Sequence, residues 1–154
     1  MILVAHFQKV EVHIQVDFTT GHAIIPHEVE YSYKLMFEER AISVMAYNLN
    51  TIFSEKVEAV LSRNITGTRM RDYYDIYILV TLYKESLLRN EILDAIKIKA
   101  KERNTLEHIE DYKTHLKNIS NSMEIQKLWS AYQDDYSGLN CAVNAQIGCS
   151  SRGF

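Results

Sequence analysis

Residues 53–63 (FSEKVEAVLSR) and 69–77 (RMRDYYDIY) decide the fold, because they predict two neighbouring helices with ionisable side chains at apolar positions. At about 100° per residue, Lys56 falls between Ile52 and Val60 on the first helix. It therefore lies inside the apolar stripe that faces the core. A charge in such a place is costly unless it is paired with another group or with a ligand.

The second helix is apolar around almost its whole circumference from residue 73 to residue 82, which predicts a buried helix. Asp72 and Asp75 nevertheless lie one turn apart near its start. Carboxylates in a first helical turn are favoured by the helix dipole. Glu55 and Glu58 of the first helix, in contrast, fall well outside the apolar stripe.

Two interpretations of these charges stay open at this point. One is a functional site at which the lysine and the two aspartates meet a ligand. The other is a structural ion pair between the two aspartates and one of the nearby cations, namely Lys56, Arg63, Arg69 or Arg71.

Length and composition indicate a single domain with a core of ordinary size, since the chain has 154 residues and a mass of 17.9 kDa. A net charge of −3 gives no global signature of nucleic-acid or membrane binding. No apolar run is as long as a membrane span, and no basic region precedes the apolar start. We therefore expect a soluble cytoplasmic protein.

The N-terminal third predicts strands. Apolar and polar residues alternate from residue 9 to residue 18, within a strand expected over 2–18. The alternation places Asp17 on the polar face. Turn residues follow at 19–22, Pro26 marks an extended segment, and 42–47 predicts another short strand.

From about residue 50 the pattern becomes helical, with Asn50 or Thr51 as the expected cap of the first helix. Residues 64–68 predict a loop, and three more helices are expected at 89–102, 105–119 and 123–136. The fold class is therefore α+β, with a partial sheet over 1–49 and a helical domain over 50–136. Residues 137–154 contain both cysteines and show neither period, which predicts a poorly ordered or aberrant tail.

Several motifs occur in a specific order along most of the chain: QVDFTTG at 15–21 with Pro26 after it, YNL at 47–49, SEK at 54–56 with Ala59 and Arg63, and RMRDYYDIY at 69–77. In these features the chain resembles the AbiEii/AbiGii-type nucleotidyltransferase toxins of bacterial abortive-infection and toxin–antitoxin modules, which act in phage defence. The resemblance implies part of a polymerase-β-like mixed sheet followed by a C-terminal helical bundle.

The resemblance also implies chemistry. Such enzymes bind a nucleoside triphosphate with Mg²⁺ and transfer a nucleotidyl group to RNA, in some relatives to transfer RNA, and a cognate antitoxin accompanies them. Asp17 matches an acidic metal position and Lys56 the lysine that contacts the triphosphate. Asp72 and Asp75 match the motif that orients this lysine. The candidate phosphate or RNA contacts are Arg63, Arg69 and Arg71.

The sequence departs from the superfamily in its metal ligands. It has no Gly-Ser or Gly-Gly and no Asp-x-Asp, and the nearest substitute, 28–30 (EVE), follows Asp17 instead of preceding it. Two of the usual three carboxylates are thus missing, and Mg²⁺ would be held weakly. We therefore expect a truncated, C-terminal part of a longer toxin that does not turn over nucleotide by itself.

Two other functions also fit parts of the sequence. In a metal-independent ribonuclease of the helical HEPN type, Arg103 would stabilise the phosphate transition state and His108 would act as acid–base. Alternatively, the helical part would be a non-catalytic module that binds the antitoxin or RNA. The basic run at 97–103 is most simply a solvated helix face.

Overall fold

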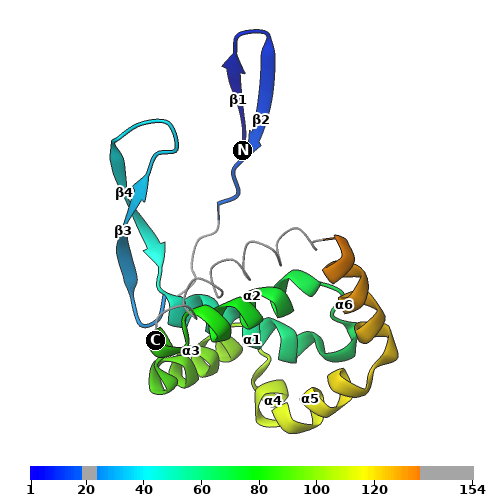
Figure 1. Ribbon diagram of the computed structural model, residues 1–154. Coiled ribbons are helices and arrows are strands. Elements are labelled where there is room, and N and C mark those ends of the chain that lie inside the picture. The colour runs from blue at the N-terminus through cyan, green and yellow to red at the C-terminus, as the bar shows by residue number, and fades with distance from the viewer. Residues whose placement is uncertain (19–23, 136–154) are drawn as a thin grey trace, which may run out of the picture.

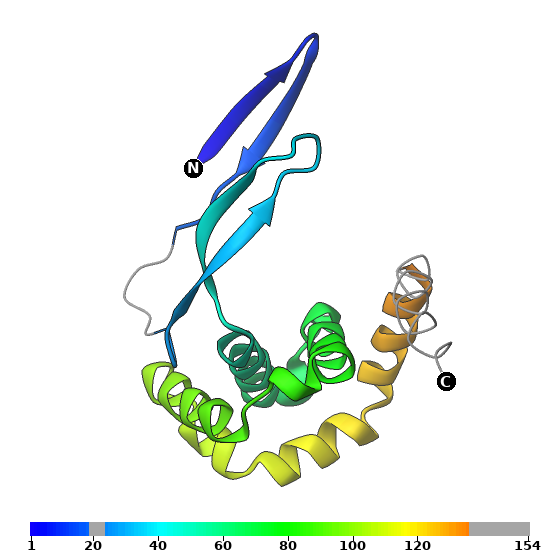
Figure 2. The ribbon, with the colours of Figure 1, turned by 60° about the vertical axis from the view of Figure 1, so that its left-hand side comes forward.

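Two β-hairpins project from one side of a body built of helices in this computed structural model (Figures 1 and 2), which describes residues 1–18 and 24–135. The strands are β1 (Ile2–Phe7), β2 (Val10–Gln15), β3 (Glu28–Lys34) and β4 (Ala41–Tyr47). The helices are α1 (Leu49–Arg63), α2 (Met70–Leu82), α3 (Arg89–Glu102), α4 (Leu106–Glu110), α5 (Tyr112–Asn121) and α6 (Met123–Asp135). The α+β class is confirmed.

The strands pair locally. β1 pairs antiparallel with β2, and β3 pairs antiparallel with β4, which gives two separate sheets of two strands each. The single strand expected over 2–18 is wrong, because the chain turns at Gln8 and Lys9. Gln8 has a φ of 54°, a conformation for which glycine or asparagine is the usual signal. A glutamine at this position gave no sign of a turn in the sequence.

Each hairpin has one apolar face. Leu3 is paired with Ile14 in the first hairpin, and Tyr31 with Val44 in the second. All four side chains are exposed. The hairpins therefore contribute little to the buried core.

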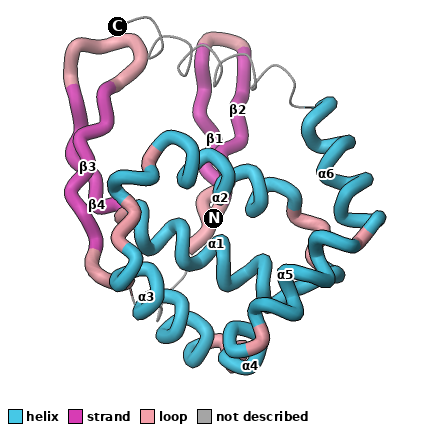
Figure 3. The backbone as a smooth tube through the Cα atoms, turned by 60° about the horizontal axis from the view of Figure 1, so that its bottom comes forward, coloured by secondary structure: helices cyan, strands magenta, loops and turns pink. Residues whose placement is uncertain are grey.

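The core of the described residues lies among the helices, and α1 is its central element (Figure 3). This helix contacts α2 on one side and α3 on another, and it also touches α4 and α5. The buried apolar side chains are Val60, Leu61, Met70, Leu79, Ile92, Ala95, Ile96, Ala100 and Ile125. Two of the α3 members are alanines, so α3 can approach α1 closely.

The N-terminus of α1 is capped by Asn48, whose side-chain oxygen accepts a hydrogen bond of 2.8 Å from the Thr51 backbone N–H. The expected cap at Asn50 or Thr51 is therefore wrong. Asn50 instead joins two helices, because its side-chain oxygen accepts from the Leu88 N–H and its side-chain nitrogen donates to Glu91. This contact fixes the start of α3 against α1.

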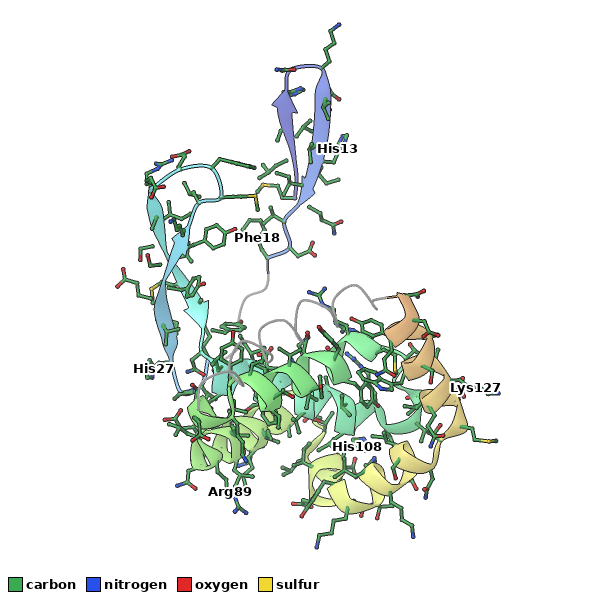
Figure 4. All side chains as sticks on the ribbon, viewed as in Figure 1. His13, Phe18, His27, Arg89, His108 and Lys127 are labelled. Atoms are coloured by element: carbon green, nitrogen blue, oxygen red, sulfur yellow. The ribbon has the colours of Figure 1, made fainter. Side chains whose placement is uncertain are left out.

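The second hairpin is attached to the same point. The Asn48 side chain donates to the His27 carbonyl at 2.8 Å, and the Thr51 hydroxyl donates to the Ile25 carbonyl. Figure 4 labels His27 at the base of this hairpin, beside the helices. The first turn of α1 thus anchors β3 as well as α3.

The remaining helices follow the sequence expectations closely. The helix expected at 89–102 is α3, and the one expected at 123–136 is α6, described as far as Asp135. The helix expected at 105–119 is divided at Asp111 into α4 and α5, since aspartate disfavours a helix interior. The expected tail, 137–154, lies outside the described residues. No helix in the described ranges could cross a membrane.

Close packing of α3 on α1 predicts that Ala95→Leu destabilises the protein. Ala95 is 1% exposed, so the added carbons must displace neighbours. The free energy of unfolding, measured by urea titration, should fall by about 1–3 kcal/mol. Lys97→Leu, at an exposed position of the same helix, is the control and should change it by less than about 0.5 kcal/mol. Equal effects of the two substitutions would contradict the packing described.

Candidate functional site

Lys56 lies between two carboxylates of the neighbouring helix. Its Nζ is 2.8 Å from Asp72 Oδ1 and 2.7 Å from Asp75 Oδ2. The aspartates are three residues apart on α2, so both point to the same side of that helix. The Lys56 side chain is 23% exposed, and it lines a pocket described below.

Two arginines complete the surroundings of Asp72, whose side chain is only 4% exposed. Arg63 Nη1, from the last turn of α1, lies 3.0 Å from Asp72 Oδ2. Arg69 Nε lies 3.6 Å from the same oxygen. Asp72 is therefore paired with three cationic side chains, those of Lys56, Arg63 and Arg69.

Burial acts against ionisation of Asp72, but the hydrogen bond and charge of Lys56, together with Arg69 and Arg63, hold the pKa of this carboxyl below its ordinary value. Burial likewise acts to lower the pKa of Lys56. The hydrogen bonds and charges of Asp72 and Asp75 outweigh that effect and raise the Lys56 pKa. Both groups are therefore charged at neutral pH.

Next to them, the Tyr73 hydroxyl has a pKa raised by burial and by the Asp72 charge, so it is neutral at physiological pH.

The loop between α1 and α2 helps to place Arg63. Asn64 ends α1 with a φ of 47° and a ψ of −133°, and its backbone N–H donates to the Val60 and Leu61 carbonyls. Gly67 then packs against the arginine: an added Cβ would lie 3.3 Å from Arg63 Cβ and 3.3 Å from the Asn64 carbonyl oxygen. A side chain at Gly67 would press on the arginine.

A second charged cluster lies on the other side of α1. Glu58 is 1% exposed, although it falls outside the apolar stripe of the helical wheel. Its carboxylate accepts hydrogen bonds from Arg103 and, at 2.7 Å, from the Thr105 hydroxyl. The helical wheel missed this because α1 packs against α3 and α4 as well as α2.

The basic run at 97–103 is not a uniformly solvated face. Lys99 is 1% exposed, and its Nζ lies 3.0 Å from Glu55 Oε1 and 3.7 Å from Glu102 Oε2. Lys99 and Arg103 are four residues apart, so they lie on one side of α3. That side packs against α1, which explains why alternate members of the run are buried or paired.

The two charged clusters border one pocket of about 300 Å³. On the α2 side its walls include Lys56, Arg69 and Asp72, and on the α3 side they include Arg103. Ala59 and Ser62 of α1 also line it, and their small side chains leave the space open. We call this cavity the charged pocket.

Not every sequence-predicted residue lies at this pocket. The side chain of Asp17 is exposed and accepts a hydrogen bond of 3.1 Å from Gln15, and the ion pairs of Lys56 are both with α2. Figure 4 labels the next residue, Phe18, on the hairpin side of the molecule. Arg71 is exposed, and no ion pair among the described residues includes it. The structure thus brings together Lys56, Asp72, Asp75, Arg63 and Arg69, without Asp17 or Arg71.

The residues of the ribonuclease alternative have other partners. Arg103 binds Glu58, whereas the His108 ring packs edge-on against that of His115, with the ring centres 5.2 Å apart. Figure 4 labels His108 on the lower side of the helical body. No hydrogen bond between described residues joins Arg103 to His108, so the geometry does not favour this function.

A comparison with protein families decides the affiliation. The family described as "Nucleotidyl transferase AbiEii toxin, Type IV TA system" matches residues 3–141. The chain belongs to this family. The family is one of nucleotidyl transferase toxins of type IV toxin–antitoxin systems, which implies a cognate antitoxin. Neither the search of curated proteins nor that of solved structures gave a match.

The Lys56–Asp72 contact predicts a specific pH dependence for this AbiEii chain. Because the Asp72 pKa is lower in the folded protein than its ordinary value of 3.8, its contribution to stability is present above that value and disappears as the pH falls through the folded pKa. Asp72→Asn should lower the free energy of unfolding by about 3 kcal/mol at pH 7. The difference from the parent should shrink on approach to pH 2.5.

Urea titrations followed by circular dichroism between pH 7 and pH 2.5 measure this difference. Glu38→Gln is the control, because Glu38 pairs with Arg40 on the surface, and it should cost less than about 1 kcal/mol. A constant difference between Asp72→Asn and the parent at every pH would contradict the assigned ionisation.

Proposed function

We propose that the charged pocket binds the phosphates of a nucleoside triphosphate for nucleotidyl transfer to RNA, with transfer RNA as the acceptor. The observation that carries the proposal is Lys56, which is charged and partly accessible between Asp72 and Asp75. A buried ion pair is no more stabilising than apolar packing of the same volume. Its presence beside an open pocket therefore supports a role in binding.

Each group has a distinct task in this proposal. The ammonium of Lys56 acts as a point charge toward a phosphate oxygen. The carboxylates of Asp72 and Asp75 hold that ammonium in place and keep it protonated. Arg63 offers a planar set of donors that matches the geometry of a phosphate.

RNA would approach the same edge of the pocket. Arg69 and Arg71 are exposed and lie at the start of α2, next to the proposed phosphate site. Their charges would attract the RNA backbone, whose phosphates dominate affinity.

The donor set does not fit Mg²⁺. Among the described residues, no group of three or more His, Cys, Asp or Glu side chains could hold a metal ion. Asp17 lies in the first hairpin segment, and the carboxylates of Asp72 and Asp75 already face cations. Mg²⁺ needs several oxygen ligands in octahedral geometry, and these side chains do not supply them.

Nucleotide binding should depend on Lys56. Lys56→Met removes the charge while keeping the apolar stem, and Asp72 retains Arg63 and Arg69 as partners. Isothermal titration calorimetry with ATP, CTP, GTP and UTP should show about tenfold weaker binding of the preferred nucleotide. Lys97→Met, which removes an exposed lysine of α3, is the matched control and should bind as the parent does. Unchanged affinity in Lys56→Met would refute the proposal.

Binding without turnover is expected of this chain alone, because the described residues supply no metal-binding carboxylate set. Single-turnover assays with labelled triphosphates, Mg²⁺ and transfer RNA should yield no labelled RNA. Mg²⁺-dependent labelling that disappears in Lys56→Met would show that the chain is itself an active transferase.

A further inference from the structure

We infer that Arg103 is a second phosphate-binding residue of the charged pocket, held in position by buried Glu58, and that the pocket consequently prefers a polyphosphate to orthophosphate. The inference rests on the proposed function, in which Lys56 binds a phosphate in the same pocket. It adds a residue from another helix and a preference for one class of anion.

Arg103 is both anchored and accessible. It ends α3, where its backbone N–H bonds to the Lys99 and Lys101 carbonyls. Its Nη1 donates to Glu58 Oε2, and yet its side chain is 36% exposed and lines the pocket. A guanidinium has five N–H donors, so donors remain for a ligand after the contact with Glu58.

Both carboxylate oxygens of Glu58 are used to hold Arg103 and its neighbour Thr105. Glu58 is 1% exposed, and its two oxygens are engaged separately, one by Arg103 and the other by the Thr105 hydroxyl. The other two acids that line the pocket are paired as well, Glu55 with Lys99 and Asp72 with Lys56 and Arg63. Burying an acid at this depth costs free energy that an apolar side chain would not. The arrangement is explained if the orientation of Arg103 matters to the protein.

Lys56 and Arg103 reach the pocket from different directions. Lys56 and Glu58 are two residues apart on α1, so they point to nearly opposite sides of that helix. The first side meets α2 and the second meets α3. Both cations line the same cavity of about 300 Å³. In the inferred arrangement, orthophosphate contacts one of the two cations and a chain of phosphates contacts both.

The experiment compares inorganic tripolyphosphate with orthophosphate, because neither carries a base that would add contacts. Affinities are measured by isothermal titration calorimetry on the full chain. In Arg103→Gln, tripolyphosphate binding should weaken about tenfold and orthophosphate binding by less than about twofold. Arg103→Lys should restore part of the loss, since it keeps the charge but not the planar fork. Lys101→Gln, at an exposed position of α3, is the control and should change neither affinity.

The role of Glu58 is tested by Glu58→Gln and by the double variant Glu58→Gln/Arg103→Gln. The double variant pairs two neutral amides, so it leaves no buried charge without a partner and should keep the parent melting temperature. Both variants should lose the preference for tripolyphosphate. If Glu58 had a purely structural role, these variants would change the melting temperature and leave the ratio of the tripolyphosphate and orthophosphate affinities unchanged. That result would overturn the inference.

Failure of the inference and failure of the proposed function give different results. If Lys56→Met loses affinity for both anions while Arg103→Gln binds tripolyphosphate within twofold of the parent, the inference alone is wrong. If Arg103→Gln weakens the binding of both anions by the same factor, the inferred preference for polyphosphate is wrong. If Lys56→Met binds both anions as the parent does, the proposed function is wrong.

Discussion

The ion pairs of Lys56 with Asp72 and Asp75 are the constraint on which the rest of the site depends. These ion pairs hold α2 against α1, with Lys56 Nζ 2.8 Å from Asp72 Oδ1 and 2.7 Å from Asp75 Oδ2. Because Asp72 is almost fully buried, its charge requires partners, and this draws Arg63 and Arg69 to the same place. The charged pocket exists because these cations meet there while α1 presents small residues between them.

α1 holds charged clusters on two sides, and this is unusual for the central helix of a small core. Its contact with α2 contains Lys56, and its contact with α3 contains Glu55 and Glu58. Buried ion pairs contribute little net stability compared with apolar packing, but losing one partner is expensive. A site that needs a fixed arrangement of charges is a sufficient reason to retain them. Membership in the AbiEii nucleotidyl transferase family agrees with an anionic ligand.

The sequence predicted the α1–α2 half of the site better than the α1–α3 half. Lys56 lies in an apolar stripe and the aspartates lie at the start of an apolar helix, so both were visible on a helical wheel. Glu58 was not, because a wheel compares a residue with one apolar stripe and cannot show that a second helix covers the polar face. Asn48 was missed as the α1 cap by a small shift of the helix start, and the turn at Gln8 lacked its usual residues.

A double-mutant cycle on Lys56 and Asp72 tests the central claim most directly. Free energies of unfolding are measured at pH 7 for the parent, Lys56→Met, Asp72→Asn and the double variant. The account predicts a coupling energy of at least about 1 kcal/mol between the two side chains, because they are in contact and largely removed from water. Additivity of the two substitutions within about 0.3 kcal/mol would contradict it, since the contact on which the pocket depends would then carry no free energy.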